Sequence, residues 1–266
     1  LGAVGAAIAT IAAQAVSGFF SFFVMRDRLP FSFTKKNMHF DKRLALSVVK
    51  LGTPIALLRM CNEVSYLVIM GLVNQLGVVA SSGVGIAEKL VMFIVLIPTA
   101  YMSAICAFVA QNVGAGQPAR AKKSMWVGMA TAAGIGGMMA YLSFFYGDVL
   151  SRFFIEDAAV IAASAEFLKA TSVECLVLSL AYSYNGYFNG IEKTDFVMMQ
   201  VLCAIFLVRI PYAYFASTRA NPTLSNIGLS ATFAAVFMLV LCSVYYGIVS
   251  RRTARTSTTK YRRVSD

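Results

Sequence analysis

Residues 90–123 read LVMFIVLIPTAYMSAICAFVAQNVGAGQPARAKK. The stretch carries no charged side chain from Leu90 to Ala119, and three basic residues follow between Arg120 and Lys123. A helix needs about 20 apolar residues to cross a bilayer, and lysine and arginine concentrate on the cytoplasmic side of membrane proteins. The stretch therefore predicts a transmembrane helix that ends at the cytoplasmic surface.

The rest of the chain repeats this pattern. Only 13% of the residues are charged and the mean hydropathy is +0.72, whereas soluble domains carry about 25% charged residues. We therefore predict an all-α integral membrane protein of about seven transmembrane helices and exclude a water-soluble fold. The expected helices cover residues 1–24, 45–73, 86–113, 124–147, 164–190, 196–217 and 226–249.

The net charge of +11 is concentrated beside the expected helices. Basic residues gather in 26–43, 120–123 and 251–263. These segments follow the first, third and last expected helices, which places them on one side of the membrane. That side is cytoplasmic by the positive-inside rule. We expect a multi-pass protein of the plasma membrane with a cytoplasmic C-terminus, embedded in the lipid bilayer and with no nucleic-acid partner.

Residues that catalyse reactions or bind metals are scarce. The five cysteines lie in apolar stretches without a CxxC pair, and the one histidine, His39, lies in a basic segment. The sequence contains no GxSxG, HExxH or Walker A motif. We therefore predict that the protein is not an enzyme, that it has no firm metal site and that it carries no cofactor.

Five motifs together resemble the MATE (multidrug and toxic compound extrusion) family. They are LGTP at 51–54, VGIAEKL at 84–90, QNVGAGQPARAKK at 111–123, NGYFNG at 185–190 and VRIP at 208–211. Members of this family have twelve helices in two six-helix lobes that alternate between inward-open and outward-open states. The resemblance implies the C-terminal lobe of that fold at 45–250 and the last helix of the N-terminal lobe at 1–24. It also implies a basic cytoplasmic linker at 25–44 and a basic cytoplasmic tail at 251–266.

The resemblance further implies a function. We expect a bacterial cation-coupled antiporter that exports small organic cations or drugs by alternating access, with a proton or sodium ion as the coupling ion. The missing N-terminal helices of the same transporter are the expected partner, and the chain alone is expected not to transport. A flippase for lipid-linked compounds or polysaccharides, from the same superfamily, and an inactive structural fragment are the alternatives.

Polar residues inside the expected helices are the candidates for binding substrate or cation, because a charge at the centre of a spanning helix costs about 2.5–3.5 kcal/mol. Arg59, Asn62, Glu63 and Tyr66 recur at helical spacing on one face of the second helix. Arg59 and Glu63 either neutralise each other or line a cavity where Glu63 attracts cations or exchanges a proton.

Glu174 begins a second polar face that continues to Asn185. Sodium-coupled MATE members use carboxylates in their seventh and tenth helices, so sodium could bind at Glu63 or Glu174. Counting from the motifs instead places the family's two acids on Asn62 and near Leu178. We expect Glu63 to contribute more than Glu174 to coupling or cation attraction.

The remaining charged and motif residues are given architectural roles. Glu88 and Lys89 are expected to reach the outer membrane surface from the end of the third helix. Arg209 is expected to pack or to form an ion pair. The motif residues assigned to architecture are Gln111, Asn112, Gly114, Gly116, Arg120, Pro54, Arg209 and Pro211.

Overall fold

The computed structural model describes residues 2–26, 41–219 and 222–262, so most of the linker expected at 25–44 lies outside the described residues. The chain divides into two compact units, Leu1–Gly52 and Thr53–Asp266. Every regular element of the described residues is helical. The elements are α1 (Gly2–Arg26), α2 (Lys42–Asn74), α3 (Val78–Gly114), α4 (Pro118–Phe145), α5 (Gly147–Arg152), α6 (Ala158–Gly190), α7 (Thr194–Cys203), η2 (Ala204–Arg209), α8 (Ile210–Ser217) and α9 (Leu224–Arg262).

The first unit contains α1 and the first turns of α2. Apolar side chains are exposed all along α1, for example Ile8, Ile11 and Phe19. A helix that is apolar on all sides belongs in a membrane or in the core of a larger protein. This agrees with its expected role as a spanning helix.

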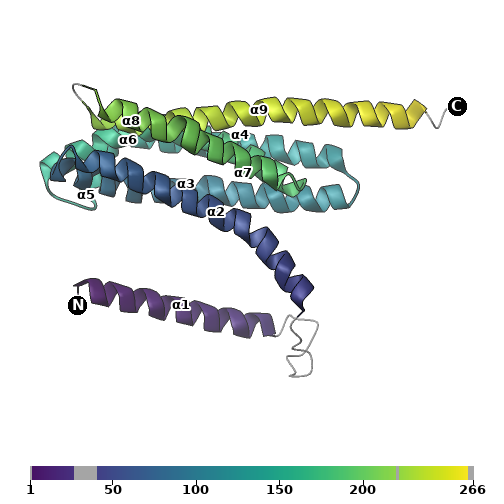
Figure 1. The fold of residues 1–266 in the computed structure, drawn as a ribbon, viewed down its shortest axis with the longest axis horizontal. Helices are drawn as coiled ribbons and strands as arrows, with labels where there is room; N and C mark the ends of the chain where they lie inside the picture. The colour runs from purple at the N-terminus through teal and green to yellow at the C-terminus, as the bar shows by residue number, and fades with distance from the viewer. Residues whose placement is uncertain (1, 27–40, 220–221, 263–266) are drawn as a thin grey trace. The chain divides into compact units, whose positions relative to one another are not determined.

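The second unit is a bundle whose long helices lie side by side and alternate in direction (Figure 1). α7, η2 and α8 follow each other without a break and act as one rod over 194–217. The all-α membrane fold with seven long rods is thus confirmed for the described part of the chain. Six of them are long and apolar enough to cross a membrane, by length and composition, within the described residues.

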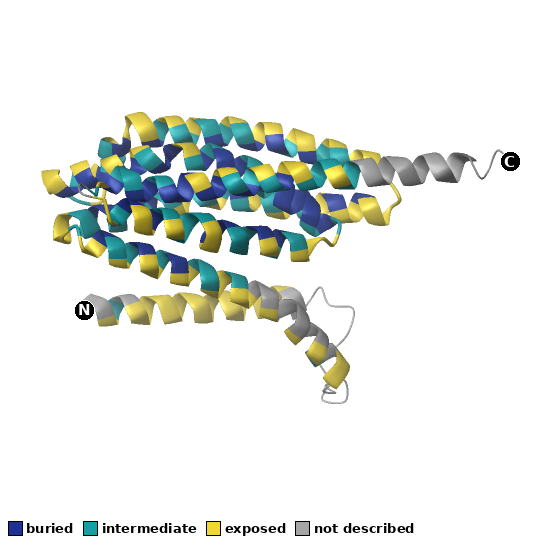
Figure 2. Ribbon diagram, turned by 45° about the horizontal axis from the view of Figure 1, so that its top comes forward, coloured by how far each residue is buried: buried dark blue, intermediate teal, exposed yellow. Residues whose placement is uncertain are grey.

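The remaining rod, α6, is the centre of the bundle. It packs against α3, α4, α5, α7 and α9, and much of its surface is buried (Figure 2). It carries the charged residues Glu166, Lys169 and Glu174 and a polar C-terminal half. Because other helices surround it, α6 can be more polar than a helix that faces lipid.

Several helices begin earlier than expected. α3 begins at Val78 rather than 86, and α6 at Ala158 rather than 164. The gap between the expected helices at 45–73 and 86–113 implies a long connection, but the structure has only a tight turn before α3, which the Ser81 hydroxyl supports by donating to Asn74 Oδ1 at 2.6 Å. At α6 the Asp157 carboxylate caps the helix by accepting from the backbone N–H of Ala159 at 2.8 Å.

The loop between α3 and α4 explains the glycine-rich part of the longest motif. Gly116 has φ +71°, in the left-handed region that favours glycine. The Gln117 N–H donates to the Asn112 carbonyl at 2.8 Å, which closes the end of α3. α4 then begins with Pro118 in its first turn.

The basic ends of α4 and α9 meet. Lys122 Nζ donates to Ser250 Oγ at 3.1 Å, which joins the start of α4 to a position close to the end of the apolar part of α9. At the opposite end of the bundle the Ser225 N–H donates to Glu166 Oε1 at 3.0 Å. The basic segments near 120–123 and 251 therefore share one end of this unit, as the alternation of helices predicts.

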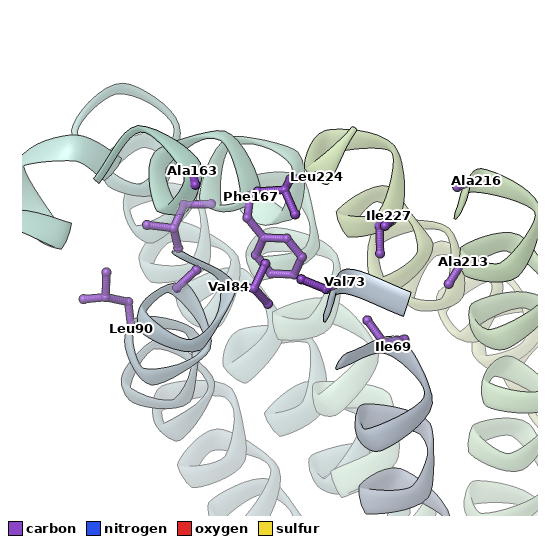
Figure 3. Packing of buried hydrophobic residues seen from close by; sticks show 12 residues of the cluster. Ile69, Val73, Val84, Leu90, Ala163, Phe167, Ala213, Ala216, Leu224 and Ile227 are labelled. Atoms are coloured by element: carbon purple, nitrogen blue, oxygen red, sulfur yellow. The ribbon is translucent and has the colours of Figure 1, made fainter. Parts of the chain in front are cut away.

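The core is built by close contact around small residues. Figure 3 shows Phe167 of α6 beside Val73 of α2 and Val84 of α3. Gly83 of α3 lies directly against α6, so that a Cβ atom there would stand 2.6 Å from Ala163 Cβ and 2.9 Å from the backbone nitrogen of Ser164. Small residues let membrane helices approach closely in this way.

We expect Gly83→Ala to destabilise the bundle, because the new methyl group would overlap with the backbone of α6. Overpacking of this kind costs about 1–3 kcal/mol. Gly85→Ala is the matched control, since no atom lies within 4 Å of its Cβ position. Thermal denaturation in detergent, followed by size-exclusion chromatography, measures the difference. Equal melting temperatures for the two variants would contradict this packing.

Candidate functional site

The polar face of α2 presents two opposite charges at its surface. Arg59 and Glu63 are both exposed, and they form no ion pair, since the ion pair found among the described residues is Asp148 with Arg152 at 3.8 Å. Exposed charges within a spanning helix must face water or other protein rather than lipid. This face is therefore suited to line a hydrated cavity.

The other two candidates on α2 point partly inward. Asn62 Nδ2 donates to the Leu58 carbonyl of its own helix at 3.0 Å. Tyr66 is half-buried and interacts electrostatically with Glu63 on the same helix and with Glu88 of α3. Tyr66 thus connects the exposed face of α2 with the interior of the bundle.

Three charged residues from three separate elements interact in that interior. Glu88 of α3 and Glu174 of α6 both interact electrostatically with Arg209 of η2, and the two carboxylates repel each other. All three side chains are half-buried. We call Glu88, Glu174 and Arg209 the inner charge cluster.

The position of Glu88 corrects the sequence analysis. We expected Glu88 at the outer end of its helix, but α3 begins at Val78, and ten residues of helix correspond to about 15 Å. Glu88 therefore lies about three turns into the helix rather than at its end, and its side chain is half-buried, while the adjacent Lys89 is exposed.

The backbone around Arg209 has an unusual geometry. Residues Ala204–Arg209 form a π-helical turn, and the N–H of Ile210 bonds to the Ile205 carbonyl, five residues earlier. Pro211 follows and lacks an N–H of its own. One additional residue in a turn rotates the residues after it by about 100° around the helix axis. The VRIP motif therefore marks the place where the helix changes the direction of its side chains.

Asn185 lies apart from the inner charge cluster. It is 2% exposed, and its Oδ1 accepts a hydrogen bond from Gln200 Nε2 of α7. The Cys242 thiol of α9 lies 2.9 Å from Gln200 Oε1 and 3.6 Å from Asn185 Oδ1. This buried network joins α6, α7 and α9 through Asn185.

Among the motif residues near the end of α3, Asn112 is buried and the others lie at the bundle surface or in the turn described above. Asn112 is 7% exposed and donates to the Phe108 carbonyl at 2.7 Å. The Arg120 guanidinium lies over the Phe108 ring, 5.8 Å from its centre. Gln111 and Gly114 are exposed. Pro54 lies in α2, and its side chain is outside the described residues.

Groups that could bind a metal ion are few. No three His, Cys, Asp or Glu side chains gather within the part of the chain that the structure describes. Glu88 and Glu174 are the two carboxylates that share an electrostatic environment in the bundle interior. Such a pair of carboxylates can bind a proton, or a monovalent cation that has further oxygen ligands.

Sequence comparison links this chain to membrane transporters. The sequence model of the MatE family matches residues 54–215. The chain is 26% identical over 255 residues to the probable multidrug resistance protein YpnP of Bacillus subtilis, which covers 92% of this chain and 55% of that protein. It is also 26% identical over 226 residues to the FAD transporter of Shewanella oneidensis, with 80% of this chain and 47% of that protein covered.

A third relative is the multidrug resistance protein PmpM of Pseudomonas aeruginosa, 26% identical over 174 residues, with 65% of this chain and 36% of that protein covered. The chain spans about half the length of the first two of these relatives. A solved structure of an inward-facing multidrug resistance MATE family transporter of the MOP superfamily aligns with a TM-score of 0.70 and 13% identity. The alignment covers 97% of this chain and 60% of that chain, and it shows that the two share a fold.

We expect Gln200→Ala to lower thermal stability, because it leaves the buried amide of Asn185 without its partner. An unsatisfied buried polar group costs about 1–3 kcal/mol. Gln75→Ala is the control, since Gln75 is exposed in the turn between α2 and α3. The melting temperature in detergent measures both changes, and a Gln200→Ala variant as stable as the control would contradict the network.

Proposed function

Because this chain belongs to the MatE family, we propose that it provides one lobe of an antiporter that exports organic cations or drugs by alternating access in exchange for a proton or sodium ion. The observation that carries this proposal is the inner charge cluster, Glu88, Glu174 and Arg209, held in the interior of a membrane bundle. Charged groups in such positions are expensive and mark ion or substrate pathways.

The exchange follows from charge compensation. A carboxylate in the bundle interior is stable when a cation accompanies it, whether that cation is a coupling ion or a substrate. A conformational change can be driven only by a ligand that binds the two states with different affinity. When a cation accompanies the carboxylates, the lobe interacts with its surroundings differently than when the carboxylates are bare. This difference in interaction free energy couples cation binding to the conformational change.

The complete transporter is proposed to contain a second helix bundle. The relatives are about twice as long as the chain, and the exposed pair Arg59 and Glu63 needs a polar partner surface or water. We propose that the face of α2 that carries Arg59 and Glu63 lines the cavity between the two bundles. Transport is therefore tested in the complete gene product.

The proposed activity is tested in proteoliposomes loaded with a fluorescent organic cation such as ethidium. We expect efflux that depends on an imposed ion gradient. A protonophore abolishes it if the coupling ion is a proton, and a sodium ionophore abolishes it if the coupling ion is sodium. Because one relative is named as an FAD transporter, FAD is included as an anionic substrate. Gradient-independent or absent movement of both compounds would refute the antiporter.

We expect Glu63→Gln to weaken the apparent affinity for a cationic substrate. The loss of one charge at the exposed face of α2 removes about 1 kcal/mol of attraction at 4 Å in a water-like medium, or about fivefold in affinity. Glu156→Gln is the control, because Glu156 is exposed in the loop between α5 and α6. The Michaelis constant for ethidium efflux at matched expression measures the effect, and an unchanged constant would exclude Glu63 from the cation path.

The topology is proposed from the basic segments, which share one end of the bundle. We expect a reporter fused after Asp266 to be cytoplasmic and a reporter inserted in the loop at 153–157 to face outward. Paired alkaline phosphatase and green fluorescent protein fusions measure the two positions. The reverse pattern would overturn the proposed orientation.

A further inference from the structure

Two side-chain contacts join α4 and α9 at the basic end of the bundle. Lys122 and Trp126 lie one turn apart on the same face of α4, and Tyr246 and Ser250 are spaced in the same way on α9. Lys122 Nζ donates to Ser250 Oγ at 3.1 Å. One turn further into the bundle, the rings of Trp126 and Tyr246 meet edge to face with their centres 5.9 Å apart. We call these four residues the α4–α9 quartet.

The quartet lies where the apolar part of the bundle ends. The apolar span of α9 ends at Ser250, and Arg251 and Arg252 follow it in the sequence. Trp126 is 50% exposed, and tryptophan gathers at the interface between membrane and water. Lys122 lies four residues closer to the end of the bundle, which corresponds to about 6 Å along the helix. The ring of Trp126 is thus placed at the interface and the ammonium of Lys122 at the level of the lipid headgroups.

The quartet carries positive charge that no carboxylate compensates among the residues that the structure describes. The Lys122 ammonium has three N–H donors, and Ser250 accepts from it, so the ammonium can also donate to an anion. Arg120 and Lys123 add two exposed cations on the same turn of α4. The surface therefore combines a held ammonium, an excess of positive charge and a large exposed apolar ring.

We propose that the α4–α9 quartet binds the headgroup of an anionic phospholipid. Lys122 donates to a phosphate oxygen of the lipid, and Trp126 packs against the glycerol and the start of an acyl chain. Bonds between a charged donor and a phosphate are stronger than neutral hydrogen bonds, and basic residues next to spanning helices attract anionic lipids. A zwitterionic phospholipid brings its own cation, so it gains less from this surface. The inference does not depend on transport.

The chain contains a built-in reporter for this site, because Trp126 is its single tryptophan. The 266-residue chain is reconstituted into vesicles of phosphatidylcholine with brominated acyl chains, which quench tryptophan fluorescence on contact. Unbrominated phosphatidylglycerol or unbrominated phosphatidylcholine then replaces the brominated lipid stepwise. We expect the fluorescence to recover at a lower fraction of phosphatidylglycerol than of phosphatidylcholine. High salt should reduce this preference, because salt screens exposed charges.

Variants of one position test whether the preference belongs to the quartet. We expect Lys122→Gln to lower the preference for phosphatidylglycerol by about fivefold, which is the effect of one lysine near an anionic surface. Lys122→Arg keeps the charge and should retain the preference. Lys193→Gln is the matched control, since Lys193 is exposed in the turn after α6 and lies at the same end of the bundle. It makes the same change of charge and should leave the preference unchanged.

Equal recovery with the two lipids in the wild-type protein, or an unchanged preference in Lys122→Gln, would overturn the proposal. An equal loss in Lys193→Gln would also overturn it, because the charge of the whole surface rather than the quartet would then attract the lipid. Inorganic phosphate is added at constant ionic strength as a competitor, and loss of the preference would show a site for free phosphate instead of a lipid. Should Lys122→Gln fail to accumulate, the wild-type protein decides: the proposal requires a preference that high salt reduces and that inorganic phosphate at equal ionic strength does not.

Discussion

The constraint on which this structure depends is that polar and charged side chains of an otherwise apolar bundle must be covered by neighbouring helices. Two carboxylates and one guanidinium from α3, α6 and η2 share one interior region, and none of them could stand alone in hydrocarbon. The helices that carry them must therefore pack together. The same requirement keeps α6 at the centre, because the polar residues of α6 are tolerated only where other helices cover them.

Close helix packing makes this arrangement possible. Gly83 of α3 and Gly186 of α6 both lie against the backbone of a neighbouring helix, so that a Cβ atom at either position would meet that helix at less than 3.0 Å. Such contacts bring α3 and α6 near enough for Glu88 and Glu174 to influence each other. A looser bundle would admit lipid or water between them and would weaken the electrostatic coupling.

The sequence was sufficient to predict the helices, because long uncharged runs leave few alternatives in a chain of this hydropathy. It was less informative about their ends. The glycines and serines at 77–83 resemble a loop in the sequence, yet they form a turn and a packing surface, so α3 begins earlier than expected and Glu88 lies farther from its start. The π-helical turn at Ala204–Arg209 was not predicted either, because it has no simple signal beyond the nearby proline. Whether Glu63 matters more than Glu174 remains a prediction, since the structure puts them in different environments rather than ranking them.

The two polar groups on the rod at 194–217 have complementary roles. Gln200, in α7, is fixed to α6 and α9 by a buried hydrogen-bond network, whereas Arg209 ends a π-helical turn and keeps a buried donor without a partner. The first group ties the rod to the centre of the bundle. The second group keeps a buried N–H that no group among the described residues satisfies, which costs about 1–3 kcal/mol. The rod therefore combines a satisfied polar contact near its start with an unsatisfied one near its middle.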